Sequence, residues 1–164
     1  MAFVCSVCGQ HHDERLLDIR LGLPDDIHRL DTEERARRCW LAEDFAVLDD
    51  ERFFVRGLLE LPVPELESRF AYGTWCELAM PDFQELMRHW RDDDQFPPVD
   101  CVVANELEPY RDTIGLRATL HATSPDKLPT VDLADAPHEL VHAQREGITV
   151  DRSDELAAAV LHPV

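Results

Sequence analysis

Two long runs of strand-forming residues in the middle of the chain constrain its fold more than any other feature. Residues 53–61 and 70–78 are rich in aromatic, β-branched and other apolar side chains, which fit the pleated surface of a sheet. Two prolines lie between the runs and lack backbone N–H donors, so we expect the first strand to end before them. Gly57 and Gly73, inside the runs, indicate bulges or places where another group approaches the backbone closely.

Further strands and helices are expected on both sides of these runs. Residues 45–48 lead into a tight turn and would form a hairpin with the first run. Asp31 followed by Glu34 resembles a capping box, which predicts a helix over residues 32–40. The other expected elements are strands at residues 99–107, 113–122 and 130–133, and helices at residues 83–90, at residues 137–146 and after Ser153.

The connections between these elements favour one class of fold. Neighbouring strands are joined by short turns rather than by helical crossovers, which is typical of antiparallel pairing. We therefore predict an α+β fold with a mainly antiparallel sheet and helices packed on one face. A single domain would span residues 1–164, with a zinc-knuckle-like segment at residues 1–14 and the α+β body at residues 15–164.

The charge of the chain restricts its partners. It has 34 acidic and 16 basic side chains, which gives a formal net charge of −18, while 45% of the residues are apolar and can fill a core. Charge of this sign repels phosphate backbones and anionic lipids, so we expect neither nucleic acid nor a membrane as partner. The composition leaves open a protein partner with a basic surface, or a role as a mimic of nucleic acid.

The location of the protein and the state of its thiols follow from the same sequence. The N-terminus has no secretory signal, and no stretch approaches the ~20 apolar residues that a membrane span needs, so the chain is predicted to be cytoplasmic. Cys39, Cys76 and Cys101 are scattered in apolar surroundings and are expected to be small buried side chains.

The most specific local motif is Cys5-x-x-Cys8-Gly9-x-x-His12 at the N-terminus. Two thiolates three positions apart on a tight turn can bind one face of a tetrahedral Zn²⁺. A complete structural site needs four ligands, and the chain has no second Cys-x-x-Cys motif. Candidates for the third ligand are His11 and His12, and for the fourth His121, His138 and His142. The alternative is a reduced cysteine pair or a redox couple.

A second motif, His138-Glu139-Leu140-Val141-His142, has the form H-E-x-x-H. On a helix its two histidines share a face and can chelate zinc, while the glutamate can activate a bound water as general base. A third protein ligand would have to come from Asp154, Glu155 or His162 near the C-terminus. The alternative is an amphipathic helix whose apolar residues face the core.

Several motifs together resemble a bacterial family known as domain of unknown function 2199. They are the N-terminal Cys-x-x-Cys-Gly-x-x-His, Phe53-Phe54-Val55-Arg56-Gly57, Glu60-Leu61-Pro62-Val63, Phe70-x-x-Gly73-x-Trp75, and His138-x-Leu140 with Gln144-x-x-Gly147-Ile148. The resemblance covers nearly the whole chain. It implies a compact single domain and brings no established activity.

The resemblance also changes which residues of the H-E-x-x-H motif are the better functional candidates. Family members resemble His-Pro-Leu at this point and carry a glutamate where this chain has Ala143, whereas His142 matches no motif position. At Phe45, where the family tends to carry a cysteine, the chain departs again. The resemblance therefore favours His138 as a ligand over Glu139 as a general base.

These observations lead to one main functional hypothesis and two alternatives. The main hypothesis is an interaction or regulatory domain with an acidic surface, in which Cys5, Cys8, His12 and His138 bind a structural Zn²⁺. The first alternative is a zinc-dependent hydrolase or peptidase with His138 and His142 as zinc ligands and Glu139 as its base. The second is a small acidic toxin-neutralising protein of the immunity type.

Overall fold

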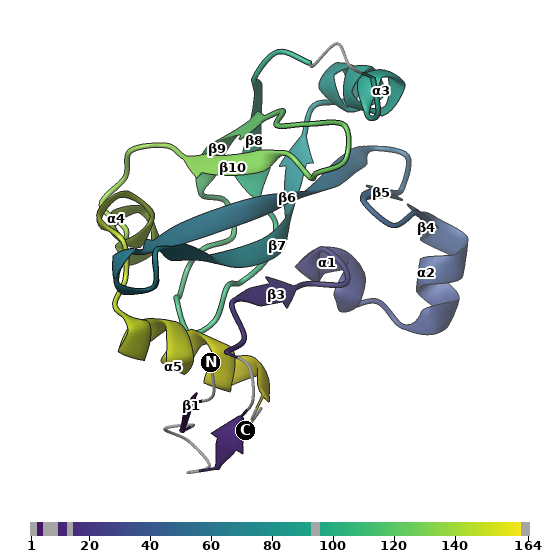
Figure 1. Ribbon diagram of the computed structural model, residues 1–164. Helices are drawn as coiled ribbons and strands as arrows, with labels where there is room; N and C mark the ends of the chain where they lie inside the picture. Colours follow the sequence, from purple (N-terminus) through teal and green to yellow (C-terminus); the bar gives the residue numbers. More distant parts are fainter. Residues whose placement is uncertain (1–2, 5–9, 13–14, 93–95, 162–164) are drawn as a thin grey trace.

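The centre of the molecule is a closed β-barrel. The computed structural model describes residues 3–4, 10–12, 15–92 and 96–161. Its barrel strands are β6 (Arg52–Val63), β7 (Ser68–Leu78), β8 (Val99–Val103), β9 (Arg117–His121) and β10 (Thr130–Leu133) (Figure 1). Each strand pairs antiparallel with the next, and β10 returns to pair with β6 in parallel. Direction alternates along such a series, so the first and fifth strands must run the same way, and closure has to be parallel.

The prediction of a mainly antiparallel sheet with helices packed on one face is therefore wrong. The fold is dominated by strands, and β7 pairs with both β6 and β8, while β10 joins the other side of β6. The parallel closure rests on a single pair, Thr130 with Leu58. Residues this far apart in sequence carry no local signal of their pairing, which is why short turns between strands did not predict a barrel.

Five further strands lie outside the barrel. β5 (Phe45–Leu48) and β4 (Cys39–Leu41) extend the sheet from β6, and β3 (Asp18–Arg20) adds a parallel strand to β7. β1 (Phe3–Val4) and β2 (His11–His12) form a separate antiparallel pair. The β5–β6 hairpin was predicted and is confirmed, whereas β3 was not predicted and β4 occupies the end of a predicted helix.

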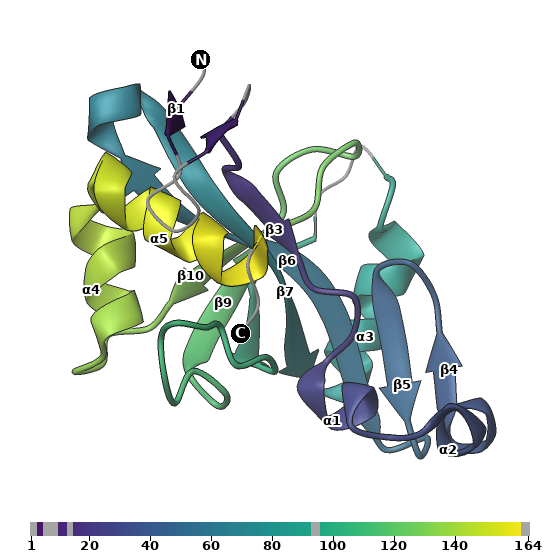
Figure 2. The same ribbon diagram turned by 90° about the horizontal axis from the view of Figure 1, so that it is seen from below.

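The helices are short and are distributed around the barrel rather than on one face. They are α1 (Asp25–His28), α2 (Thr32–Arg38), α3 (Met80–His89), α4 (Glu139–Glu146) and α5 (Val150–Leu161), with a 3₁₀ turn at Pro64–Leu66. Figures 1 and 2 show α3 on one side of the barrel, α4 and α5 on another, and α1 and α2 beside β4 and β5. The Asp31 cap of α2 is confirmed, because its carboxylate accepts a hydrogen bond from the Glu34 backbone N–H at 2.8 Å.

Two apolar clusters lie on opposite faces of the β6–β7 hairpin. The inner cluster fills the barrel with fully buried side chains such as Val55, Leu59 and Leu120. A smaller outer cluster lies beneath α1, where Ile27 packs with Phe54, Trp75 and their neighbours. Side chains alternate between faces along a strand, so β6 and β7 each contribute to both clusters.

Helix α4 closes the part of the barrel where β10 and β6 separate. The Gln144 side-chain amide donates to the Val131 carbonyl at 2.8 Å, and its oxygen accepts from the Leu133 N–H at 2.8 Å. Just beyond the helix, the Ile148 N–H donates to the Pro62 carbonyl of β6 at 2.8 Å. One side chain and one turn therefore supply hydrogen bonds that a neighbouring strand would otherwise supply.

Candidate functional site

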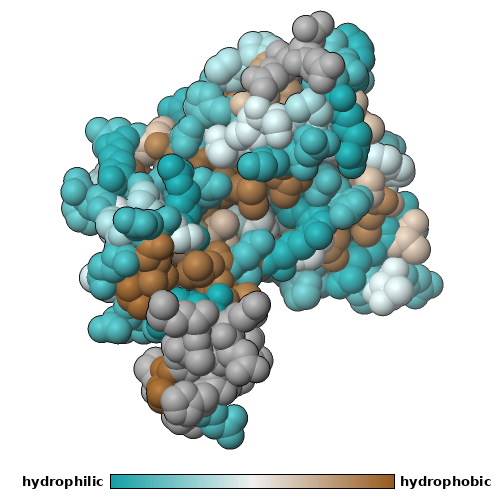
Figure 3. Space-filling model, in the orientation of Figure 1, coloured by the Kyte–Doolittle hydropathy of each residue, from teal (hydrophilic) through white to brown (hydrophobic). Residues whose placement is uncertain are grey.

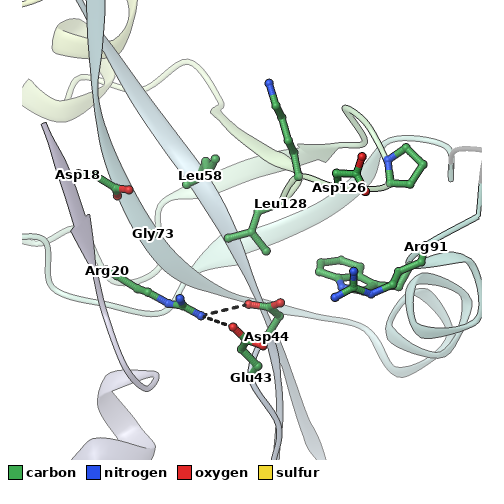
Figure 4. Close-up of a pocket in the computed structure, with 12 residues that line it drawn as sticks. Asp18, Arg20, Glu43, Asp44, Leu58, Gly73, Arg91, Asp126 and Leu128 are labelled. Atoms are coloured by element: carbon green, nitrogen blue, oxygen red, sulfur yellow. Dashed lines mark hydrogen bonds and ion pairs between the residues drawn. The ribbon is translucent and has the colours of Figure 1, made fainter.

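A cleft of about 290 Å³ lies on the outside of the barrel (Figure 4). We call it the Gly73 cleft. It is lined from β3, the β4–β5 turn, β6, β7, the end of α3 and the β9–β10 loop by Asp18, Arg20, Glu43, Asp44, Leu58, Gly73, Trp90, Arg91, Pro125, Asp126, Lys127 and Leu128. Figure 3 shows that most of this face of the molecule is hydrophilic, with hydrophobic residues near its middle and a second group at its lower left.

The floor of the cleft is a row of residues that face one another across three strands. Arg20 of β3 is paired with Gly73 of β7, and Gly73 is paired with Leu58 of β6. Paired residues point to the same face of a sheet, so Arg20 and Leu58 flank a position that has no side chain. The missing side chain at Gly73 leaves the hollow between them.

Ion pairs hold one end of the cleft. Arg20 donates to Glu43 at 3.0 Å, and the buried Arg56 donates to Asp44 at 2.7 Å (Figure 4 draws the contacts of Arg20). Hydrogen bonding from Arg20 lowers the pKa of Glu43, and the positive charges of Arg56 and Arg91 act in the same direction. Glu43 therefore stays ionised at a lower pH than an isolated glutamate does.

Arg56 connects the cleft to the outer apolar cluster. Its guanidinium donates to the carbonyls of Glu43 at 2.6 Å and Leu21 at 3.3 Å, and it lies 5.4 Å from the Trp75 ring centroid. The Trp75 indole N–H donates to the same Leu21 carbonyl at 3.0 Å. Because Arg56 is only 3% exposed, these contacts compensate a charge that has lost almost all of its water.

The opposite wall of the cleft carries an aromatic ring and two cations. Trp90 packs edge-on against Phe45 with 4.5 Å between ring centroids, which fixes its position beside the cleft. Arg91 follows it, and Lys127, from the β9–β10 loop, is the only lysine in the sequence. The residues that line the cleft are scattered along the chain, so the sequence alone indicated only Gly73, through its place inside a strand run.

The predicted zinc ligands are only partly within the described residues. Cys5 and Cys8 lie outside them, while the backbone of His12 is in β2, paired with Phe3. In both ribbon views α5 lies between this hairpin and the start of α4, which His138 precedes. Among the residues described, no group of three or more His, Cys, Asp or Glu side chains is arranged to hold a metal ion. The ligand set stays a prediction.

His138 has a structural role that the motif did not indicate. It precedes α4 as its N-cap: the Leu140 N–H donates to Nδ1 at 3.0 Å, and Nε2 lies 2.7 Å from the Arg111 carbonyl. These contacts assign the ring proton to Nε2, because Nδ1 must accept and a carbonyl cannot donate. A metal bound at His138 would have to replace one of the two hydrogen bonds.

Glu139 and His142 of the H-E-x-x-H motif are exposed, whereas Leu140 and Val141 between them are buried. Glu139 pairs with Arg152 at 3.2 Å, and His142 lies on the open side of α4. Since His138 lies before the helix, the motif does not place two imidazoles on consecutive turns of one helix face. Asp154 pairs with Arg15 at 2.8 Å and Glu155 with Arg152 at 2.8 Å, while His162 lies outside the described residues.

The remaining candidates have ordinary local partners. His121 lies 3.1 Å from Asp132 on the neighbouring strand. Cys76 and Cys101 are buried and Cys39 is half-buried, and none of the three forms a disulfide. A hydrogen bond with Cys101 and burial both raise the pKa of the Cys76 thiol, which keeps it protonated.

Two neighbouring hollows, one beside α4 and the other along residues 106–112, each have three carboxylates among their lining residues. The first, about 480 Å³, is lined by Asp135, Ala136, Pro137, His138, Glu139, Val141, His142, Arg145 and Glu146. The second, about 500 Å³, is lined by Glu106, Glu108, Pro109, Tyr110, Arg111, Asp112 and Ala159. The hydrogen bond from His138 to the Arg111 carbonyl joins them. We call this surface the acidic face.

The fold and its surface define a small protein built on a five-stranded β-barrel, with a charged cleft and an acidic face on its outside. The chain belongs to the family described as "Uncharacterized protein conserved in bacteria (DUF2199)", whose model matches residues 4–148. This confirms the resemblance found in the sequence. No curated protein and no solved structure matches the chain. Within the described ranges, none of the helices combines the length and the apolar character that a membrane-spanning segment needs.

Proposed function

We propose that this protein is an interaction domain that binds a basic protein partner through its acidic face. The observation that carries the proposal is the meeting of two carboxylate-lined hollows around His138. Each hollow has room for the long side chain of a lysine or arginine.

The distribution of charge in the molecule supports this proposal. Ten of the 16 basic side chains form ion pairs with carboxylates of the described chain. The molecule therefore uses most of its cations internally, and the surplus of carboxylates faces solvent. In such a field a cationic partner is attracted over about one Debye length, roughly 8–10 Å at ordinary salt.

Three carboxylates of the acidic face are free to act on a partner. Glu108, Asp112 and Glu146 are exposed and form no ion pair with any residue that the structure describes. Arg145 is engaged by Asp135 at 2.6 Å, so its charge is locally compensated. The net field of the face is negative.

The test uses an oligolysine peptide as the probe and two matched triple variants. One variant carries Glu108→Gln, Asp112→Asn and Glu146→Gln; the control carries Glu33→Gln, Asp50→Asn and Glu51→Gln, which removes the same charge from exposed positions elsewhere. Titration calorimetry at low salt should show about tenfold weaker binding for the first variant, since exposed charge contacts contribute about 0.2–1 kcal/mol each. Equal weakening in both variants would mean that only net charge matters and would reject a defined face.

A structural zinc ion at the N-terminal hairpin is part of the same proposal. Its support is the Cys5-x-x-Cys8 spacing, and it would hold the first residues against the body of the protein. Metal content per chain should be measured for the parent and for Cys5→Ser, His142→Ala and His138→Asn, because asparagine retains an N-cap acceptor. Loss of zinc in Cys5→Ser alone, or also in His138→Asn, supports the hairpin site. Loss only in His142→Ala supports the peptidase-like alternative, and a zinc-free parent rejects both.

A further inference from the structure

The main sheet ends in two short edge strands that differ in their protection against pairing with another chain. β3 and β4 lie at opposite ends of the strand order, and each has three residues. An edge strand exposes backbone donors and acceptors, and charged side chains or prolines usually keep a further strand from pairing with them. β3 carries Asp18 and Arg20, whereas β4 consists of Cys39, Trp40 and Leu41. The β4 edge therefore lacks the usual protection.

The hydrogen bonds between β4 and β5 determine which backbone groups face the open side of β4. The Arg38 carbonyl and the Ala42 N–H, one residue outside β4 at either end, form hydrogen bonds of 2.9 and 2.8 Å with the neighbouring chain. Hydrogen-bonded pairs alternate along an antiparallel ladder, so between these two bonds the backbone of Trp40 faces β5. The N–H and C=O groups of Cys39 and Leu41 therefore point away from the sheet.

Three of these four outward groups are available to a partner. The Cys39 N–H donates to the Arg35 carbonyl at the end of α2. No residue that the structure describes forms a hydrogen bond with the Cys39 carbonyl or with the N–H and C=O of Leu41. Figure 2 shows β4 at the outer margin of the molecule, with no other element beside this edge. A further strand can therefore pair with β4, with Leu41 as a fully hydrogen-bonded position.

Trp40 and Leu41 give this edge an exposed apolar side chain on each of its two faces. Trp40 is 49% exposed and Leu41 is 43% exposed. Neighbouring residues of a strand point to opposite faces, so an added strand would cover one of these side chains on each face of the sheet. Removal of their apolar surface from water favours the pairing.

The charges at the two ends of β4 indicate which strand fits. Arg37 is exposed at the end of α2, just before β4, and forms no ion pair with a described residue. Glu43 follows the other end of β4, and its side chain is 73% exposed. One end of the strand is therefore basic and the other acidic. An antiparallel copy of the same strand places the basic end of each beside the acidic end of the other, which a two-fold axis repeats at both ends.

We propose that two copies of this chain form a dimer by antiparallel pairing of their β4 strands, with the two-fold axis at Leu41. In this register the two Leu41 residues exchange both of their hydrogen bonds, and each Cys39 carbonyl accepts from the Glu43 N–H of the other copy. Every available group of the edge is then used. Trp40 of each copy lies opposite Ala42 of the other, whose small side chain leaves room for the indole ring.

The net charge and the location of the edge define what this dimer requires. A formal charge of −18 on each copy opposes association in general, so only a locally complementary surface can bring two copies together. At physiological ionic strength the Debye length is about 8 Å, which screens the more distant charges. The β4 edge shares no residue with the acidic face, so this proposal is independent of the proposed function.

The first experiment measures the mass of the full chain in solution by sedimentation at physiological ionic strength. At about 100 µM the parent should be mainly a dimer. Leu41→Lys places two like charges opposite each other and removes a leucine contact, so it should dimerise about tenfold more weakly or worse. Ile114→Lys is the matched control, because Ile114 is also 43% exposed, and it should dimerise as the parent does. A monomeric parent, normal dimerisation of Leu41→Lys, or equal weakening in both variants would overturn the proposal.

The second experiment tests the antiparallel register by exchanging charges. Arg37→Glu places two acids at each end of the pairing, and Glu43→Arg places two bases there, so each variant alone should dimerise about tenfold more weakly than the parent. An equimolar mixture of the two variants should form a heterodimer with an affinity near that of the parent, because each end again has one acid and one base. The heterodimer has the same total charge as the parent dimer, which controls for net charge. A mixture that dimerises no better than the separate variants would rule out this register and overturn the proposal.

Discussion

The side chains on the two faces of strand β6 belong to one backbone but have very different surroundings. On the inner face, side chains such as Val55, Leu59 and Leu61 are fully buried among apolar neighbours. On the outer face the environment changes at each step: Phe54 lies in an apolar cluster, Arg56 in a charged network, and Leu58 in an open cleft. The side chains of the inner face pack only against apolar neighbours, whereas those of the outer face contact segments outside the barrel, among them α1 and the β4–β5 turn. A binding site can therefore form outside without disturbing the interior.

The largest expected difference in stability is between alanine variants of the adjacent residues Leu58 and Leu59. Leu59→Ala should lower the free energy of unfolding by about 3–4 kcal/mol, because it leaves a cavity in a sealed interior. Leu58→Ala removes a half-buried side chain from the cleft and should cost about 1 kcal/mol. Urea denaturation of both variants measures the contrast, and similar losses would show that the two faces are not energetically distinct.

On the outer face of β6, we expect the largest loss of stability from substitution of Arg56. Arg56→Met leaves the Asp44 carboxylate and the Glu43 carbonyl without their buried donor, and should cost about 3 kcal/mol. The double variant Arg56→Met/Asp44→Leu removes both charges and should recover most of this loss. A double-mutant cycle by chemical denaturation checks the coupling; additive effects would contradict an ion pair that matters to stability.

Alanine substitutions at Gly57, which faces the interior, and at Gly73, which faces outward, should change stability in opposite directions. Gly57→Ala should destabilise by about 2 kcal/mol, because the new methyl group overlaps Val131 where the barrel closes. Gly73→Ala should stabilise by about 0.5–1 kcal/mol, since the strand gains a residue with less conformational freedom to lose. Thermal unfolding of the two variants decides this. A loss of stability at Gly73 would mean that the fold itself requires glycine there.

A further expected effect, smaller than that at Gly57, concerns the junction between β10 and α4. Gln144→Leu keeps the volume of the side chain and removes both of its hydrogen bonds to β10, which should cost about 1–2 kcal/mol. Gln84→Leu, at an exposed position of α3, is the control and should change stability little. Equal effects in the two variants, measured by urea denaturation, would show that the Gln144 contacts do not support the barrel.

Local patterns predicted the elements better than they predicted the architecture. The Asp31 cap, the β5–β6 hairpin and the strand at Thr130–Leu133 were all found from neighbouring residues and are confirmed. The β6 strand runs through Pro62, which was expected to lie beyond it, because an imide residue costs nothing where no neighbour needs its N–H. The place of Pro62 in the folded protein, rather than its local sequence, therefore determines how far the strand extends.

Barrel closure and the cleft could not be predicted in the same way. Closure depends on one parallel pair, Leu58 with Thr130, whose partners are distant in sequence. The cleft combines β3, only three residues long, with α3 and two loops, and none of these segments has a pattern of its own that indicates a site. Gly73 was the one recognisable signal, because its place in a strand called for an explanation that only the assembled structure provides.

Strand β10 has a strand partner on one edge and, along most of the other, only the side chain of Gln144. Detachment of α4 would thus free the Leu133 amide and the Val131 carbonyl, while β10 stays paired with β9. Hydrogen exchange at Leu133 would then report the fraying of a single eight-residue helix rather than global unfolding, and water would enter the interior first along this edge.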